Sequence, residues 1–232
     1  MNKQLTVESA LVVAAHPDDE ALGCGGTIAK LVEQHASVHV AFMADGVFSR
    51  SAQKDEHAQQ LVARRDAARR ACAQLGVKSV SFGEFPDNRM DSIPMLDIAQ
   101  AVESLVNKYS PELILTHHAG DLNVDHQRLS AAVVTACRPQ AGMDVRTILM
   151  FEVPSSTEWH VPGAAPAFAP NWYVDISKNL DRKIAALNEY SVEMREWPHP
   201  RSVRGVTHLA HWRGATVGVD AAEAFVLGRR ID

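Results

Sequence analysis

The 232-residue sequence predicts an α/β fold, a Rossmann-like three-layer sandwich whose central sheet is mainly parallel, with residues 1–232 forming one domain. Short apolar strand-like runs alternate with longer helix-like segments, which is typical of βαβ units. The first run, residues 11–15, ends abruptly in His16, Asp18, Asp19 and Glu20. Ligands of open α/β sheets bind beyond the carboxyl ends of the strands, so this strand is expected to deliver a functional site.

The later elements are expected in alternating order. Strands are predicted over residues 37–45, 79–85, 113–118, 147–153 and 172–176, because these runs are short, apolar and rich in β-branched residues. Helices are predicted over 21–35, 54–75, 95–108, 125–137 and 180–195, and the second carries an apolar stripe that ends before Gly76. Segment 154–170 contains four prolines and is expected to be a loop over the pocket, the alternative being a mobile surface connection.

Composition and charge exclude several classes of protein. The net charge of -5 comes from interspersed acids and bases without a basic stripe, so no nucleic-acid partner is expected. The longest apolar stretch near the N-terminus, residues 10–15, is too short for a signal peptide or a membrane span, which favours a cytoplasmic protein. Cys24, Cys72 and Cys137 form no C-x-x-C pattern, so neither a disulfide framework nor a thiolate zinc site is expected.

Two clusters of histidines and acids follow predicted strands. Right-handed crossovers bring the carboxyl ends of parallel strands to one edge, so segments 44–46, 86–89 and 116–126 should converge with His16. The second cluster comprises His117, His118, Asp121, Asn123, Asp125 and His126. Imidazole and carboxylate ligands suit zinc, and catalytic zinc sites often use three of them. His16, one carboxylate of the first cluster and His126 would form such a set.

The motifs carry a resemblance to a known family. Ala15-His-Pro-Asp-Asp-Glu20, then Gly23-Cys-Gly-Gly-Thr27 and later Asn123-x-Asp125-His126, resemble the PIG-L/LmbE-like family of zinc-dependent N-deacetylases. The resemblance extends to Arg64, Pro86-Asp87, Pro198-His-Pro-Arg-Ser202 and Arg213-Gly214. It implies that His16, Asp19 and His126 hold one Zn²⁺, with another divalent ion such as Fe²⁺ left open, and that Asp18 is the general base. Glu20 is expected to stabilise the start of the following helix, because a carboxylate interacts favourably with the positive end of the helix dipole.

The sequence departs from the family pattern at Asn123. Many members have a histidine there, paired with the aspartate that is Asp125 here. An amide can donate a hydrogen bond to an oxyanion but cannot shuttle a proton. Asn123 is therefore expected to stabilise the oxyanion, with Asp125 beside it. Protonation of the leaving amine falls to Asp18 or to another histidine, for which His199 is the candidate.

Three residues are candidates for substrate binding. Arg64 matches a family arginine that reaches the substrate, although the glutamate usual three residues later is Ala67 here, and the solvated face of a helix is the alternative. Asp87 and Arg89 follow a predicted strand and could contact sugar hydroxyls or an anionic group.

The resemblance implies a zinc-dependent amidohydrolase that removes an N-acetyl or related N-acyl group from an amino sugar, sugar nucleotide or glycoconjugate. A zinc hydrolase of a non-sugar amide or ester would share the same residues. A non-catalytic sugar-binding module is the alternative from another class, and the intact Asp18 argues against it. The oligomeric state stays open, a homo-oligomer included.

Overall fold

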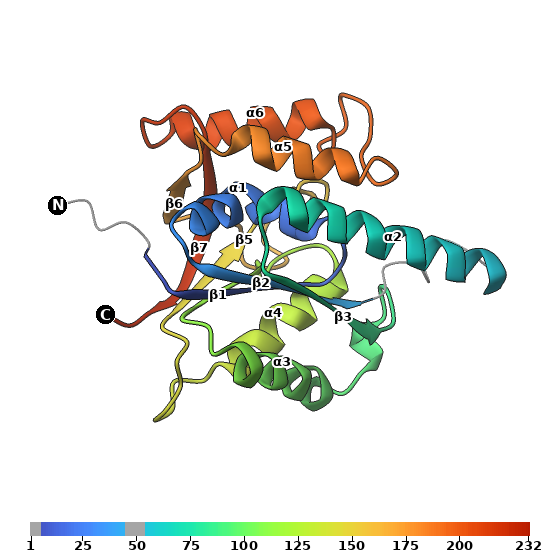
Figure 1. Ribbon diagram of the computed structural model, residues 1–232, viewed down its shortest axis with the longest axis vertical. Coiled ribbons are helices and arrows are strands. Elements are labelled where there is room, and N and C mark those ends of the chain that lie inside the picture. Colours follow the sequence, from blue (N-terminus) through green and yellow to red (C-terminus); the bar gives the residue numbers. More distant parts are fainter. Residues whose placement is uncertain (1–5, 45–53) are drawn as a thin grey trace.

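The apolar run near the N-terminus forms β1 (Ser9–Ala14), an inner strand of a seven-stranded sheet (Figure 1). The computed structural model describes residues 6–44 and 54–232. Four more strands run parallel to β1 in the order β3-β2-β1-β4-β5: β2 (Ser37–Ala44), β3 (Ser79–Phe85), β4 (Leu113–His117) and β5 (Thr147–Phe151). The predicted α/β fold with a mainly parallel sheet is confirmed.

Helices cover both faces of the sheet (Figure 1). One layer contains α1 (Asp19–Glu33), α2 (Lys54–Leu75), α5 (Leu180–Glu189) and α6 (Val203–Ala215). The other contains α3 (Met95–Tyr109) and α4 (Val124–Ala136). Alternate residues of β1 enter two separate buried clusters, with Val12 on one face and Leu11 and Val13 on the other. This two-sided burial explains the uninterrupted apolar run.

The far edge of the sheet contains two strands that run antiparallel to each other. Strand β7 (Ala222–Arg230) pairs antiparallel with β5 on one side and with β6 (Trp172–Asp175) on the other. The sequence pattern predicts β6 but gives no clear signal for α6 or β7. Helix α6 buries only Val206, Ala210 and Gly214, so its apolar stripe is weak. The end of β7 is only half buried, so its sequence lacks a clear alternation of apolar and polar residues.

Helix α1 is interrupted at Cys24, whose φ of −147° and ψ of 21° are not helical. The carboxylate of Glu223 accepts hydrogen bonds from the backbone N–H groups of Gly26 (2.9 Å) and Thr27 (2.7 Å). Lys183 Nζ donates to Leu22 O (2.8 Å) and to Glu223 (2.5 Å). A buried ion pair from α5 and β7 thus satisfies the backbone groups that a helix interruption leaves unpaired. It fixes the two parts of α1 on either side of Cys24 to α5 and β7.

Close packing explains the glycines of the same segment. A Cβ atom at Gly23 would lie 2.3 Å from the Phe151 ring, and one at Gly26 would lie 2.7 Å from Ile176. Among the described residues, the ends of β1 and β4 and the residues after β3 meet at one rim, as expected, because His16, Asp87 and His126 line the same cavity. In segment 44–46, Asp45 and Gly46 lie outside the described residues. Among the described residues, no helix is both long and apolar enough to cross a membrane.

Candidate metal centre and active site

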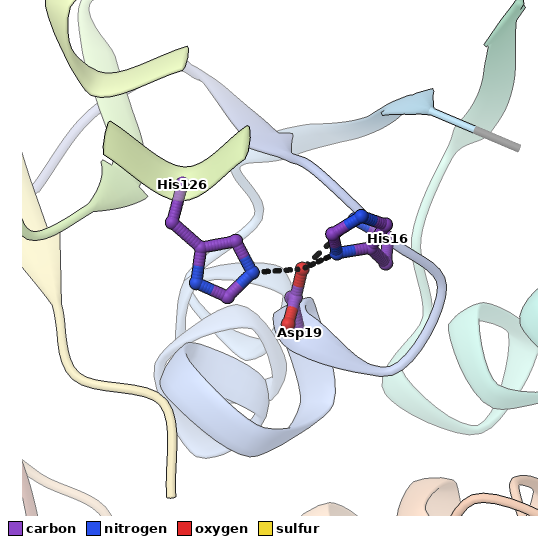
Figure 2. A group of neighbouring side chains, drawn as sticks. All are labelled: His16, Asp19 and His126. Atoms are coloured by element: carbon purple, nitrogen blue, oxygen red, sulfur yellow. Dashed lines mark hydrogen bonds and ion pairs between the residues drawn. The ribbon is translucent and has the colours of Figure 1, made fainter. Parts of the chain in front are cut away.

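Three buried side chains converge at the rim. His16 lies in the turn after β1, Asp19 begins α1 and His126 lies in the first turn of α4. Asp19 Oδ2 is 3.4 Å from His16 Nδ1 and 3.3 Å from His126 Nε2 (Figure 2). The candidate ligand atoms all lie within 4.8 Å of one another. His126 Nε2 is buried and makes no hydrogen bond with any described residue. This unsatisfied nitrogen and the imidazole–carboxylate donor set fit a divalent cation.

Two carboxylates orient His16 from behind. Its Nε2 lies 3.1 Å from Asp87 Oδ1 and 3.0 Å from Asp125 Oδ2, so Nδ1 faces Asp19. Asp125 also accepts hydrogen bonds from the backbone N–H groups of Asn88 (2.7 Å) and Met90 (2.9 Å). Burial lowers the pKa of His16, but the hydrogen bonds to Asp125 and Asp19 outweigh burial and raise it well above its usual value. Such outer carboxylates fix the orientation of metal-ligating histidines.

A third carboxylate, to which no role was assigned from the sequence, orients His126. Asp121 Oδ1 lies 3.0 Å from His126 Nδ1. Asp121 also accepts hydrogen bonds from Ser156 Oγ and from Thr157 Oγ1 (2.5 Å). Burial alone would raise the pKa of Asp121, but the charge of His126 holds it well below its usual value. The sequence signal for this role was the position of Asp121 in the second cluster of histidines and acids, five residues before His126.

Two carboxylates dominate the charge around His126. Burial lowers the pKa of His126, but the charges of Asp19 and Asp121 outweigh burial and raise it to about 9. The same negative charge would be compensated by a divalent cation. His117 stacks on His126 at 3.8 Å between ring centroids, and burial together with the charge of His126 lowers the pKa of His117 to about 3. Because Ala15 N–H donates to its Nε2 (2.8 Å), His117 serves as a neutral packing residue.

Asp18 stands beside this group and is held by arginines. Its Oδ2 accepts a hydrogen bond from Arg201 (3.0 Å), and its Oδ1 lies 4.0 Å from Arg64. Asp18 has a left-handed φ of 111°, a strained conformation of the kind found at functional sites. Its backbone N–H donates to Glu20, which also accepts from the Tyr190 hydroxyl (2.6 Å). Burial raises the pKa of Asp18, and the charge of Arg201 opposes only part of that rise.

Arg201 and Tyr190 were missed as site residues. Arg201 belongs to the Pro-His-Pro-Arg-Ser motif, which was the only signal for it. Burial raises the pKa of Glu20 to about 8, although the hydrogen bond from Tyr190 opposes this rise. Glu20 therefore holds the turn that presents Asp18, in addition to lying at the start of α1.

A cavity of about 450 Å³ opens over the group. The expected site residues that line it are His16, Asp18, Asp19, Arg64, Asp87, Asn123 and His126. Ser155, Ser156 and Trp159 also line it, so segment 154–170 forms part of its wall. His118 Nε2 donates to Pro166 O (2.9 Å) and ties the same segment to the end of β4.

Two of the expected residues that line the cavity, Asn123 and Arg64, also hold neighbouring segments in place. Asn123 Oδ1 accepts from Asp125 N–H (2.8 Å) and caps α4, while its Nδ2 donates to Asn88 Oδ1 (2.9 Å). Arg64 donates to Glu193 (2.9 Å) and to Pro17 O (3.2 Å), which joins the turn before α1 to the segment after α5.

Three expected residues are not among the described residues that line the cavity: Arg89, Asp125 and His199. Arg89 is exposed, and Asp125 is buried behind His16. His199 Nδ1 accepts from Arg201 N–H (3.0 Å).

The fold and the site together define a class: an α/β protein with a candidate divalent-metal centre at the carboxyl ends of its parallel strands. Residues 11–137, more than half of the chain, match the model of the PIG-L family, described as GlcNAc-PI de-N-acetylase. The chain therefore belongs to the PIG-L family. The matched region contains both motifs of the candidate metal centre, whereas Arg201, Tyr190 and Lys183 lie beyond it.

The alignments with named relatives cover most of the length of this chain. It is 27% identical over 184 residues to a probable N-acetyl-alpha-D-glucosaminyl L-malate deacetylase 2 of Bacillus cereus, covering 78% of this chain and 81% of the relative. It is also 27% identical to a 4-oxalmesaconate hydratase of Pseudomonas putida, covering 97% and 88%. The solved N,N'-diacetylchitobiose deacetylase of Pyrococcus horikoshii has the same fold, with a TM-score of 0.78, 18% identity, and coverage of 96% and 84%.

Proposed function

We propose that this protein is a zinc-dependent N-deacetylase that acts on an N-acetylated amino sugar or its glycoconjugate. One observation carries the proposal. The buried His16–Asp19–His126 group lies in the same cavity as Asp18, a carboxylate that is not part of this group and accepts a hydrogen bond from Arg201. Two relatives, one named a probable N-acetyl-alpha-D-glucosaminyl L-malate deacetylase and the other a diacetylchitobiose deacetylase, support the amino-sugar substrate.

Each residue has a distinct part in the proposed hydrolysis. His16, Asp19 and His126 would hold the ion, with their orientation maintained by Asp87, Asp125 and Asp121. A bound Zn²⁺ would polarise the amide carbonyl and acidify a water molecule. Asp18 takes the proton of the attacking water and, when the amide bond breaks, gives it to the departing nitrogen.

Asn123 is the proposed oxyanion donor. One amide hydrogen of its Nδ2 goes to Asn88, and the second remains for a substrate oxygen in the cavity that Asn123 lines. Replacing Asn123 with serine retains an α4 capping oxygen but removes the amide donor. We expect kcat to fall roughly a hundredfold to a thousandfold, the usual scale for one such donor.

Thermal unfolding and metal analysis provide the control for this variant. Asn123→Ser should keep its metal and its melting temperature, whereas Asn123→Ala should also lose about 1 kcal/mol of stability with the cap. A serine variant with the wild-type kcat would remove Asn123 from the reaction.

His199 supplies a second test, because the sequence analysis offered it as the acid for the leaving amine. Its Nδ1 is engaged by Arg201 N–H, and the ring is not among the described residues lining the cavity. We therefore expect His199→Gln to leave kcat and its pH profile nearly unchanged. Loss of one limb of that profile would assign the proton transfer to His199 instead of Asp18.

A hydratase is the second candidate, because a relative aligned over 97% of this chain is named 4-oxalmesaconate hydratase. The same base could direct water to a carbon–carbon double bond. The zinc-loaded protein should be incubated with N-acetylated amino sugars, sugar nucleotides, glycosides, non-sugar amides and esters, and unsaturated dicarboxylic acids. Equal release of acetate and free amine from a sugar supports the deacetylase. Hydration without acetate supports the hydratase, and turnover of non-sugar substrates alone supports the broader hydrolase.

A further inference from the structure

Trp159 is a large aromatic side chain on the wall of a polar cavity. It ends the 3-10 helix η2 (Thr157–Trp159) within segment 154–170, and it is 50% exposed while lining the cavity. The same lining also includes Asp87, Asn88 and Asn123. One cavity therefore combines a flat apolar surface with hydrogen-bonding groups, and packing in the hydrophobic core does not account for the exposed indole.

The turn that carries Trp159 is held by several hydrogen bonds. The backbone N–H groups of Ser155 and Ser156 donate to the Glu158 carboxylate at 2.7 Å and 3.3 Å. Val153 N–H donates to Thr157 Oγ1 (2.8 Å), and the side chains of Ser156 and Thr157 donate to Asp121. The ring is thus presented on a preorganised turn, which lowers the entropic cost of using it as a binding surface.

The same turn is linked by side-chain contacts both to the candidate metal centre and to Asp18, the proposed base. Asp121, which anchors the turn, also contacts His126 Nδ1 at 3.0 Å. Arg201 donates to Ser155 Oγ (3.0 Å) and to Asp18 Oδ2 (3.0 Å), so one guanidinium joins the turn to the proposed base. The position of the indole is therefore fixed relative to the reacting centre.

His199 supports the indole from the side. Its ring meets Trp159 edge to face, with 5.5 Å between the centroids and an interplanar angle of 81°. This is a favourable aromatic geometry, and it gives His199 a positioning role without requiring it to reach the substrate.

We propose that Trp159 determines substrate class by receiving the apolar face of a pyranose ring. The C–H groups on one face of such a ring can pack on the indole, while hydroxyl groups at its rim can reach Asp87 and Asn88. The inference rests on the proposed deacetylase function and adds that the N-acyl group must sit on a cyclic sugar. An acyclic acetamide would leave the indole uncovered.

The kinetic test compares Trp159→Ala, Trp159→Phe and the control Trp212→Ala in the zinc-loaded protein. Trp212 is 64% exposed on α6 and is not among the described residues of the cavity. For N-acetylglucosamine or its methyl glycoside, Trp159→Ala should raise KM roughly tenfold to a hundredfold, the scale expected for uncovering a large side chain. Trp159→Phe should recover part of the loss, and Trp212→Ala should match the wild type.

A binding test separates this inference from the reaction itself. In the zinc-loaded Asp18→Asn protein, N-acetylglucosamine should change the intrinsic fluorescence of the chain, which has four tryptophans. The change should vanish in Asp18→Asn/Trp159→Phe and persist in Asp18→Asn/Trp212→Phe. N-acetylethanolamine, an acyclic acetamide, should bind both Trp159 forms equally weakly.

These two tests distinguish failure of the deacetylase function from failure of the role of Trp159. If the sugar binds through Trp159 but no acetate is released by the wild type, the deacetylase function fails and the assigned sugar contact stands. If the sugar does not bind, or binds equally well to Trp159→Ala, the role of Trp159 is overturned even where acetate is released.

Discussion

Replacing Asp18 with asparagine is expected to reduce hydrolysis by roughly two to four orders of magnitude, the range for loss of a general base, while the metal stays bound. Asparagine has nearly the same shape but cannot take a proton. Asp18 is positioned by Arg201 and lies outside the His16–Asp19–His126 group, so metal affinity should be retained. Single-turnover kinetics and metal analysis of the same purified sample would measure both properties.

An exposed aspartate provides the matched control. Asp66 on α2 pairs at the surface with Arg69 (2.7 Å), and Asp66→Asn should leave rate and metal content unchanged. Unchanged turnover in zinc-loaded Asp18→Asn would remove Asp18 as the base. Loss of metal from that variant would instead make Asp18 a ligand.

Removing His126 should release the metal and abolish turnover. Its buried Nε2 faces Asp19 Oδ2, so His126→Ala would leave the proposed centre with only His16 and Asp19. The expected result is a substoichiometric metal content after dialysis, measured by elemental analysis. Asp121→Asn should weaken metal binding about tenfold to a hundredfold, because it alters only the group that orients the ligand.

Two controls protect this prediction from a folding artefact. His126→Gln retains a polar side chain between Asp19 and Asp121, and its circular dichroism should match the wild type. His211→Ala, at an exposed position of α6, should retain stoichiometric metal. A His126→Ala protein that binds zinc with native affinity would contradict the ligand assignment.

Strands β1, β2 and β4 of the parallel part of the sheet could be predicted because they are buried on both faces. Residues 11–15 and 113–115 show this as continuous apolar runs, each followed within two residues by a histidine. The convergence of His16 and His126 followed from parallel topology, since β1 and β4 are neighbours and their carboxyl ends meet at one edge.

The contacts around Asp18 could not be predicted in the same way. Arg201 lies 183 positions away in the chain, and Tyr190 reaches Glu20 across 170 positions. Neither contact follows from periodicity or motif spacing, because both depend on how the segments after β6 pack over α1. Asp87 and Asp125 were expected at the rim, yet their contact with the outer nitrogen of His16 depends on side-chain geometry that spacing does not specify.

The position of β7 between β5 and β6 has a consequence for biosynthesis. Among the described residues, the sheet order makes β7 the sole partner of β6, and the outer edge of β5 is covered by β7. The ribosome makes the five parallel strands first, so the nascent sheet ends at an open β5 edge until β7 is translated. Unpaired backbone groups at such an edge invite pairing with other chains. The β5 edge is therefore the part of the sheet most exposed to such pairing until β7 emerges from the ribosome and covers it.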